Sequence, residues 1–495
     1  MNKAGRIFTV GLLLPFIWLT VMALASGEAA GQPSVPLPSG VSVQEMSKSL
    51  LNAVGTGNVQ KVRDLLARGA DPNAKDMWDE TALMKAAGSG RADIVRLLLE
   101  RGADVNMNAS AGGALLRAAN FGNADCVKML IDKGADVNAG NGAVLVGGAA
   151  LEKSAVLLLL LDKGVVLDPK PGYEPALMRA AHNNRFENVN LLLAKGANVN
   201  ARDRDKWMSL MWAASSGHVE VARLLLDKGA DIQAKNNYGN TALMIASYSG
   251  KTQTAALLIE RGADVNAKNN FGDTALMQGA IRLPVVELLL NQGADMNAQN
   301  NNGETALMKA SSYNGIPATV KLLLDRGANP NAKTKNGEAA LVYAADQGHT
   351  DIAGMLLERG ADVNARDGYN RTALMKAAER GKLDVARLLL DKGADVNART
   401  NYAETALMAT VEGGRVEVAR LLLEKGADPG VKNNDGRTVL FKAVERRQLE
   451  LVKLLISKGA DVNARNKNDV SVLKQAGMTR NNEIINALKA AGAAE

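Results

Sequence analysis

The sequence has few of the residues that build most metal and catalytic sites. Among 495 residues there are 3 histidines and 1 cysteine, Cys126. A single cysteine excludes an intrachain disulfide and a zinc site made of several cysteines. Cys126 lies in an apolar helical pattern, so we expect it to be a buried structural residue. Aromatic residues make up only 3% of the chain, which is little for a large globular core.

Motifs for common enzyme chemistry are missing as well. The sequence contains neither a GxxxxGK[ST] phosphate loop nor a glycine fingerprint between a strand and a helix, and it has no GxSxG elbow. His218 and His349 each follow a glycine, His182 lies at a variable position, and none has a second ligand at metal spacing. We therefore predict no enzyme activity, no cofactor and no metal ion. The alternative, a hidden catalytic site, would need clustered catalytic groups in a pocket.

The charge balance does not favour nucleic acid as a partner. The 59 Lys and Arg residues exceed the 52 Asp and Glu residues, which gives a net charge of +7. Two of these cations, Lys3 and Arg6, lie in the N-terminal segment described next, and the others are spread along the chain without a basic block. We therefore do not expect DNA or RNA binding.

Residues 1–25 have the layout of a bacterial-style secretory signal peptide. Two positive charges precede Ile7–Ala25, which is uncharged and mostly apolar, and Ala23-Leu24-Ala25 supplies the small residues that a signal peptidase recognises. We predict a periplasmic or secreted protein, cleaved near Ala25. The alternative is an uncleaved membrane anchor at residues 7–25, because these 19 residues approach the roughly 20 that span a bilayer.

A linker separates this segment from the rest of the chain. Residues 26–42 are rich in Ser, Gly and Pro, so we expect a flexible tether. Residues 43–495 form the remaining domain, in which the phrase LLxKGADVNA recurs and its glycine repeats at intervals of 30 to 34 residues. These glycines define fourteen units, the first and last incomplete, which end at Gly69, Gly102, Gly134, Gly164, Gly196, Gly229, Gly262, Gly293, Gly327, Gly360, Gly393, Gly426, Gly459 and Gly492.

Each unit has the pattern of two short helices. In the unit that ends at Gly393, Thr372 is a good N-cap for a helix with a small apolar face, and Gly381 ends that helix. Residues 383–389 give a second amphipathic helix, and Gly393 terminates it in a left-handed conformation that is cheap for glycine. Two helices of this size cannot bury their apolar faces alone, so neighbouring units must stack.

The period, the Thr-Ala-Leu-Met phrase and the GADVNA close resemble ankyrin repeats. The resemblance covers about residues 43–495. It implies an all-α solenoid of about fourteen helix–loop–helix units with capping units at both ends. It also implies short β-hairpin-like fingers and a concave face that binds partner proteins.

The sequence departs from the family pattern in three places. Methionine replaces the family's histidine in six Thr-Ala-Leu-Met phrases, and we expect these methionines to fill the core between units. The fourth unit, around residues 141–168, is short and has an altered close. The eighth unit is also short, and Pro284 opens its second helix. We expect irregular curvature at these two units.

Aromatic residues gather at one position of the repeat. Six of them lie nine residues after a repeat glycine, where the resemblance places an exposed fingertip: Trp78, Tyr173, Tyr238, Phe271, Tyr369 and Tyr402. One hypothesis is a row of anchors for a partner, because aromatic residues dominate binding hot spots. The alternative is that each ring packs on the neighbouring finger and stiffens the row.

Basic residues gather at a second position, on the first helix after the Leu-Met pair. We call them the basic stripe: Lys85, Arg117, Arg179, Lys309, Lys376 and Lys442. The stripe could attract an acidic partner to the concave face. The alternative, which we favour, is a solvated face whose side-chain stems cover apolar surface. Phe121, Tyr248 and Tyr313 occupy variable concave positions and are further candidates for contact.

These observations predict an exported, monomeric scaffold that binds partner proteins and does not catalyse a reaction. The first alternative is a membrane-anchored spacer protein of the cell envelope. The second is a secreted effector that acts on host proteins. The sequence does not identify the partner.

Overall fold

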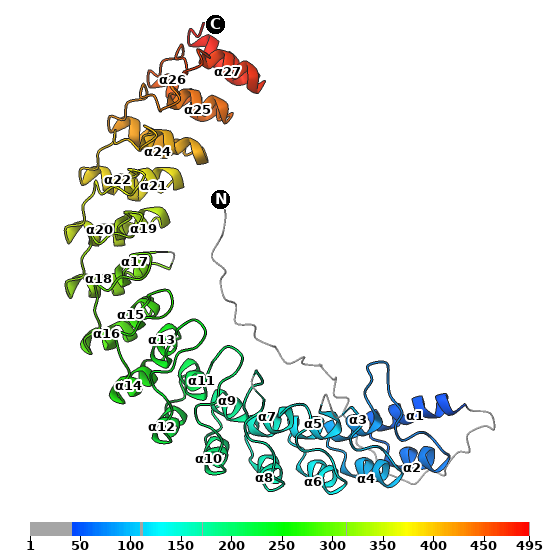
Figure 1. Cartoon of the computed structure of the whole chain (residues 1–495). Helices are drawn as coiled ribbons and strands as arrows, with labels where there is room; N and C mark the ends of the chain where they lie inside the picture. Colours follow the sequence, from blue (N-terminus) through cyan, green and yellow to red (C-terminus); the bar gives the residue numbers. More distant parts are fainter. Residues whose placement is uncertain (1–41, 109–111, 171, 313, 495) are drawn as a thin grey trace, which may run out of the picture.

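The computed structural model describes residues 42–108, 112–170, 172–312 and 314–494 (Figure 1). The predicted signal peptide, nearly all of the predicted linker, and Tyr313 lie outside the described residues. Within them, 28 α-helices form fourteen antiparallel pairs, one pair for each predicted unit. We number the units so that each ends at its repeat glycine.

The first helix of each pair carries the small apolar face that the sequence predicts. The first helices are α1 (Val43–Thr56), α3 (Ala82–Gly88), α5 (Gly113–Asn120), α7 (Ala143–Ala150), α9 (Ala176–His182), α11 (Ser209–Ser216), α13 (Ala242–Tyr248), α15 (Ala275–Gln278), α17 (Ala306–Ala310), α19 (Ala340–Gln347), α21 (Ala373–Arg380), α23 (Ala406–Ala409), α25 (Val439–Glu445) and α27 (Val472–Thr479). A 3₁₀ turn, η2 (Thr410–Gly413), continues α23.

The second helix of each pair is leucine-rich. The second helices are α2 (Val59–Ala67), α4 (Ala92–Glu100), α6 (Ala124–Asp132), α8 (Ala155–Leu161), α10 (Phe186–Ala194), α12 (Val219–Asp227), α14 (Thr252–Glu260), α16 (Leu283–Asn291), α18 (Pro317–Asp325), α20 (Thr350–Glu358), α22 (Leu383–Asp391), α24 (Val416–Glu424), α26 (Leu449–Ser457) and α28 (Asn482–Ala490).

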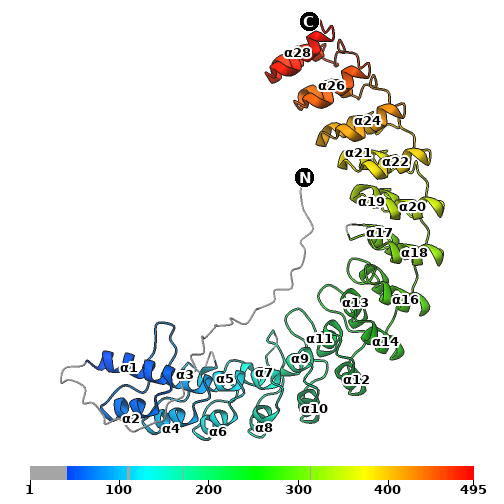
Figure 2. The same cartoon turned by 180° about the vertical axis from the view of Figure 1, so that it is seen from behind.

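The pairs stack into a curved solenoid with the first helices on the inner side of the arc and the second helices on the outer side (Figures 1 and 2). Alanines bury almost completely in the first helices, as Ala377 and Ala378 do in α21, and these small side chains let neighbouring first helices approach closely. Leucines such as Leu389 fill the wider space between second helices. The difference in side-chain size between the two layers accounts for the curvature, and one continuous core runs through the stack.

The threonine and methionine of the repeated phrase have the roles that the sequence predicts. The hydroxyl of Thr372 accepts a hydrogen bond from the Met375 amide at 3.4 Å, as an N-cap should. The thioether of Met375 in turn lies 3.4 Å from the Thr372 amide, and its side chain is buried. The other five equivalent methionines are buried too. They are core residues, as expected.

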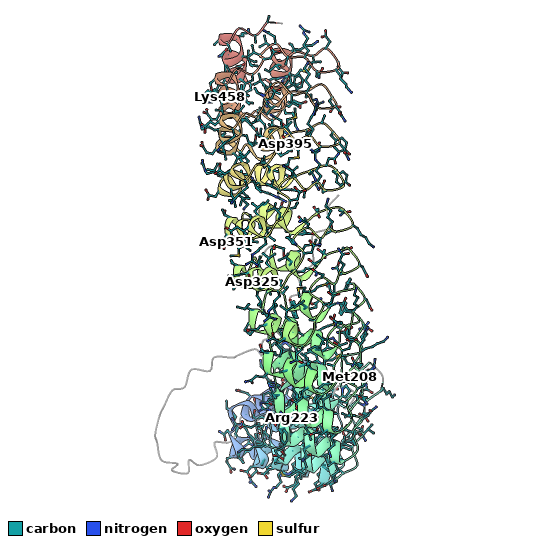
Figure 3. All side chains as sticks on the ribbon, turned by 90° about the vertical axis from the view of Figure 1, so that its left-hand side faces the viewer. Met208, Arg223, Asp325, Asp351, Asp395 and Lys458 are labelled. Atoms are coloured by element: carbon teal, nitrogen blue, oxygen red, sulfur yellow. The ribbon has the colours of Figure 1, made fainter. Side chains whose placement is uncertain are left out.

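The fingers contain no strand within the described residues, and only the isolated bridges Lys75–Thr81 and Arg465–Ser471 have β pairing. They project from one edge of the solenoid, as Figure 3 shows from the side. No helix in the described part of the chain is long and apolar enough to cross a membrane.

The fourth and eighth units are irregular for different reasons. In the eighth unit α15 has only 4 residues, and Pro284 lies in the first turn of α16. In the fourth unit the helices keep ordinary lengths, but the finger is reduced to a tight turn around Asn141, whose φ is +54°. The fourth unit therefore interrupts the row of fingers. The eighth unit instead contributes an unusually short helix to the inner layer.

Candidate partner-binding surface

The finger turns are fixed by a polar residue seven positions after the repeat glycine. Asp367 accepts hydrogen bonds from the amides of Tyr369 and Arg371, both at 2.8 Å. Asn269 does the same for Phe271 and Asp273, both at 2.9 Å. The residues Asp76, Asn236 and Thr400 make the equivalent pair of bonds in their fingers.

This capping residue is a functional feature that the sequence interpretation missed. It lies two residues before the aromatic fingertip, so it holds the backbone from which the ring projects. The recurrence of Asn, Asp or Thr at this position was the signal that could have revealed it, because such side chains form local turns with the following amides.

All six aromatic fingertips are exposed. The exposed fraction runs from 37% at Tyr238 to 75% at Trp78. Phe121 and Tyr248, on the inner face, are exposed as well. The structure thus places these residues at the surface, where a partner can reach them.

Backbone hydrogen bonds join neighbouring fingers. The carbonyl of Tyr238 accepts from the Asn270 amide at 3.1 Å, and the carbonyl of Phe271 accepts from the Asn301 amide at 2.9 Å. Such bonds continue from the finger of Asp205 to that of Lys467. Because the backbone already connects the fingers, stiffness of the row does not require ring-to-ring packing. For the four fingertips in this span, Tyr238, Phe271, Tyr369 and Tyr402, this observation favours the hypothesis that the rings are anchors.

The basic stripe is an array of ion pairs. Lys85 lies 2.7 Å from Asp76, Lys309 lies 2.6 Å from Glu304, and Arg179 lies 2.6 Å from Glu174. Lys442 reaches Glu404 of the preceding unit at 2.6 Å and Glu412 at 3.6 Å. Arg117 pairs with Glu80 of the preceding unit, and Lys376 lies 3.9 Å from Glu379. The stripe therefore does not present a row of uncompensated positive charge.

Within several pairs the anion is the more exposed partner. The Lys442 side chain is 11% exposed, against 35% for Glu404 and 41% for Glu412. Lys376 and Glu379 show the same order. In this part of the inner face the carboxylates lie outermost and the lysines lie beneath them.

Burial and ion pairing perturb the pKa values of three side chains. Burial alone would raise the pKa of Glu304, but hydrogen bonds from Lys309 and Asn300 outweigh it and hold the pKa below its usual value. Burial raises the pKa of Tyr343, in the next unit, and the neighbouring Glu304 and Glu338 carboxylates raise it further. Burial likewise raises the pKa of Cys126 to about 11, which agrees with an inert structural thiol.

The histidines have structural contacts. Nε2 of His349 lies 3.0 Å from the Ser312 carbonyl, and Nε2 of His218 lies 2.9 Å from the His182 carbonyl, so each links its unit to the preceding one. The His182 ring packs on Trp212 with centroids 4.5 Å apart, and burial lowers its pKa. The described residues contain no group of three or more His, Cys, Asp or Glu side chains placed to hold a metal ion.

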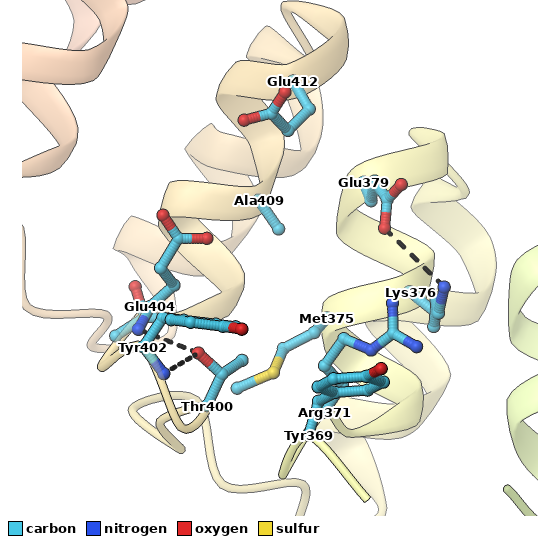
Figure 4. A pocket seen from close by; sticks show the side chains of 11 residues that line it. Tyr369, Arg371, Met375, Lys376, Glu379, Thr400, Tyr402, Glu404, Ala409 and Glu412 are labelled. Carbon is cyan, nitrogen blue, oxygen red and sulfur yellow. Dashed lines mark hydrogen bonds and ion pairs between the residues drawn. The ribbon is translucent and has the colours of Figure 1, made fainter. Parts of the chain in front are cut away.

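A cleft lies between α21 and α23, where the fingers of units 11 and 12 meet their first helices (Figure 4). Its volume is about 430 Å³. Two fingertips line it, together with polar and apolar side chains from both units: Tyr369, Arg371, Met375, Lys376, Glu379, Thr400, Tyr402, Glu404, Thr405, Ala409 and Glu412. We call it the Tyr369–Tyr402 cleft.

A second cleft, of about 450 Å³, lies at the shortened fourth unit. Gly147 takes the inner-face position there, and the finger that would cover it is reduced to the turn around Asn141. The fingertip Tyr173 and the pair Glu174–Arg179 form its far wall. The two clefts thus occur where the inner-face side chain is small, Gly147 in one and Ala409 in the other.

Comparison with known proteins identifies the repeats. A family model described as ankyrin repeats, in three copies, matches residues 50–141, 148–236, 177–269, 210–300, 273–367, 366–433 and 426–494. These matches together cover most of the chain. No curated protein matches it.

Proposed function

Because the chain belongs to the ankyrin-repeat family, whose repeats mediate contacts between proteins, we propose that it is an exported scaffold that binds partner proteins. Contact is made through the fingertips and the inner face of the arc. The protein itself carries out no reaction.

The exposed fingertips are the observation that supports this proposal. Five of the six exposed rings project from turns whose backbone is fixed by a capping residue, as at Asp367, and four of these turns are also joined by bonds between fingers, as at Tyr369. Aromatic side chains supply large contact areas and dominate hot spots at interfaces. Because the turns are already ordered, little backbone entropy is lost on binding.

Affinity purification tests the binding proposal. The chain without residues 1–25 is immobilised, and proteins retained from the periplasmic and extracellular fractions are identified by mass spectrometry. We expect one or a few proteins to be enriched, in amounts that rise with the amount of immobilised chain. Failure of every fraction to yield an enriched protein would contradict a scaffold role.

Export is proposed from residues 1–25, and the mature N-terminus tests it. A chain that starts near Ser26 supports cleavage of a signal peptide. A chain that starts at Met1 and sediments with membranes supports instead the envelope spacer anchored by residues 7–25. Recovery of the mature chain outside the producing cell would favour the secreted effector, which acts on host proteins.

A further inference from the structure

Units 11 and 12 present the same fingertip residue in two different settings. In unit 11 the Arg371 guanidinium lies over the Tyr369 ring, 5.3 Å from its centroid, and Asp367 holds it there at 2.8 Å. In unit 12 the fingertip is Tyr402, and the residue equivalent to Arg371 is Glu404. Within the described residues no cation lies over the Tyr402 ring.

The cleft beside Tyr402 is open because of one small side chain. The inner-face position that holds Lys376 in unit 11 and Lys442 in unit 13 is Ala409 in unit 12. The missing side chain leaves the cleft of about 430 Å³ between the two fingertips, as Figure 4 shows. This volume lies in the range of roughly 300–1,000 Å³ that is usual for ligand sites.

Exposed negative groups outnumber exposed positive groups in the cleft. The carboxylates of Glu379, Glu404 and Glu412 line it and are each between 35% and 41% exposed. Of the two positive residues that line it, Lys376 is only 14% exposed beneath Glu379, and Arg371, which is 35% exposed, is paired with Asp367. Glu404 and Glu412 pair with Lys442 and Arg446, and their side chains nevertheless keep 35% and 41% of their surface exposed.

We propose that the Tyr369–Tyr402 cleft binds an arginine side chain of a partner protein. The guanidinium lies over the Tyr402 ring, as Arg371 lies over Tyr369, and its N–H groups donate to the exposed carboxylates of the cleft. Arginine fits better than lysine because its planar group stacks on an aromatic face and donates to carboxylates in a fork. This inference rests on the proposed function and specifies the chemistry of the partner at one site.

A displayed library of random twelve-residue peptides tests the proposal. The library is selected on the immobilised full chain and depleted on the Tyr402→Ala variant. We expect the retained peptides to share an arginine. Replacing that arginine with citrulline, which keeps the shape and removes the charge, should weaken binding by about tenfold, and lysine should weaken it by a smaller factor. Glu379→Gln combined with Glu412→Gln should weaken binding to a similar extent.

The Phe186→Ala variant is the matched control, because it removes an exposed aromatic side chain outside the cleft and should leave binding of these peptides unchanged. Circular dichroism confirms that each variant melts like the wild type. Peptides without a basic residue, or peptides that bind equally after Tyr402→Ala, would overturn the proposal while leaving the general binding function in place. A library from which no peptide is retained at any site would count against both.

Discussion

The ammonium group of Lys442 lies 2.6 Å from the carboxylate of Glu404 in the preceding unit, and the lysine side chain is nearly buried at 11% exposure. The pair joins α25 to the finger of unit 12, 38 residues earlier in the chain. A charge this far from water depends on its partner, because an unpaired buried ammonium group is costly. The pair therefore couples two neighbouring units of the solenoid.

Removing the Glu404 carboxylate should loosen the contact between units 12 and 13. We expect Glu404→Gln to lower the local unfolding free energy by about 1–3 kcal/mol. The loss is smaller to the extent that Glu412, which lies 3.6 Å from Lys442, takes over the ion pair. Hydrogen exchange of both units measures the change. In the Lys442→Met variant the same Glu404→Gln substitution should lower the local unfolding free energy by clearly less than in the wild type. An equal loss of unfolding free energy in both proteins would mean that the pair does not couple the units.

A row of asparagines provides a second connection between units. Oδ1 of Asn364 accepts from the Asp395 amide at 2.8 Å, and its Nδ2 donates to the Gly393 carbonyl at 3.3 Å. Asn364→Ala should lower the stability of units 11 and 12 by about 1–2 kcal/mol, as seen by hydrogen exchange. Asn138→Ala in the fourth unit is the control, because within the described residues the Asn138 side chain makes only the bond to the Val166 amide. If Asn364→Ala and Asn138→Ala lowered stability equally, the asparagine row would not connect the units in the way proposed.

The glycine and threonine positions of the repeat were enough to predict the fold. Gly393 has a φ of +88°, a conformation that ends a helix cheaply only in glycine, and Thr372 caps α21, the first helix of the same unit. Both effects are local, so one sequence reveals them, and their recurrence fixed the fourteen pairs. The signal peptide and the export of the protein stay predictions.

The candidate site could be predicted only in part. The position of the fingertips followed from the repeat register, and their exposure follows from the turn that Asp367 and its equivalents cap. The pairing of the basic stripe could not be predicted, because the partner of Arg117 is Glu80 in another unit and the contact depends on the stagger between units. The clefts depend on Gly147 and Ala409, whose effect appears only once the neighbouring units are in place.

The ion pair of Glu304 should make stability depend on pH. Its pKa is held below the usual value of about 4.3, so the ionised form contributes stability above that value and loses it as the pH falls through the lowered pKa. We expect Glu304→Gln to destabilise units 9 and 10 by about 1 kcal/mol at pH 7. The difference from the wild type should fade below about pH 4. Hydrogen exchange of the wild type and of Glu304→Gln at pH 7 and below about pH 4 measures this. A stability difference between the two proteins that does not change with pH would contradict the prediction.

The irregular units should open first. Contacts in a solenoid are made between neighbours, so cooperativity breaks at weak units. Limited proteolysis should cut first around residues 141–171, in the unit whose finger is shortened, or around residues 279–285, which follow the 4-residue helix α15. Sites are identified by mass spectrometry of the early fragments. Equal protection of all units, or first cuts in unit 11, would show that these irregularities do not weaken the stack.

The fingertips give the most direct test of the proposed binding function. Two double variants replace consecutive fingertips with alanine: Tyr238→Ala with Phe271→Ala, and Tyr369→Ala with Tyr402→Ala. For each variant, capture of the purified partner and the melting temperature are both compared with those of the wild type. True anchors cost about 2 kcal/mol or more on truncation, roughly a 30-fold loss of affinity. Exposed residues change stability by less than about 0.5 kcal/mol. We predict that at least one pair loses capture while both melt like the wild type. Unchanged capture in both variants, with a lowered melting temperature, would show that the rings support the fingers and that the protein binds elsewhere.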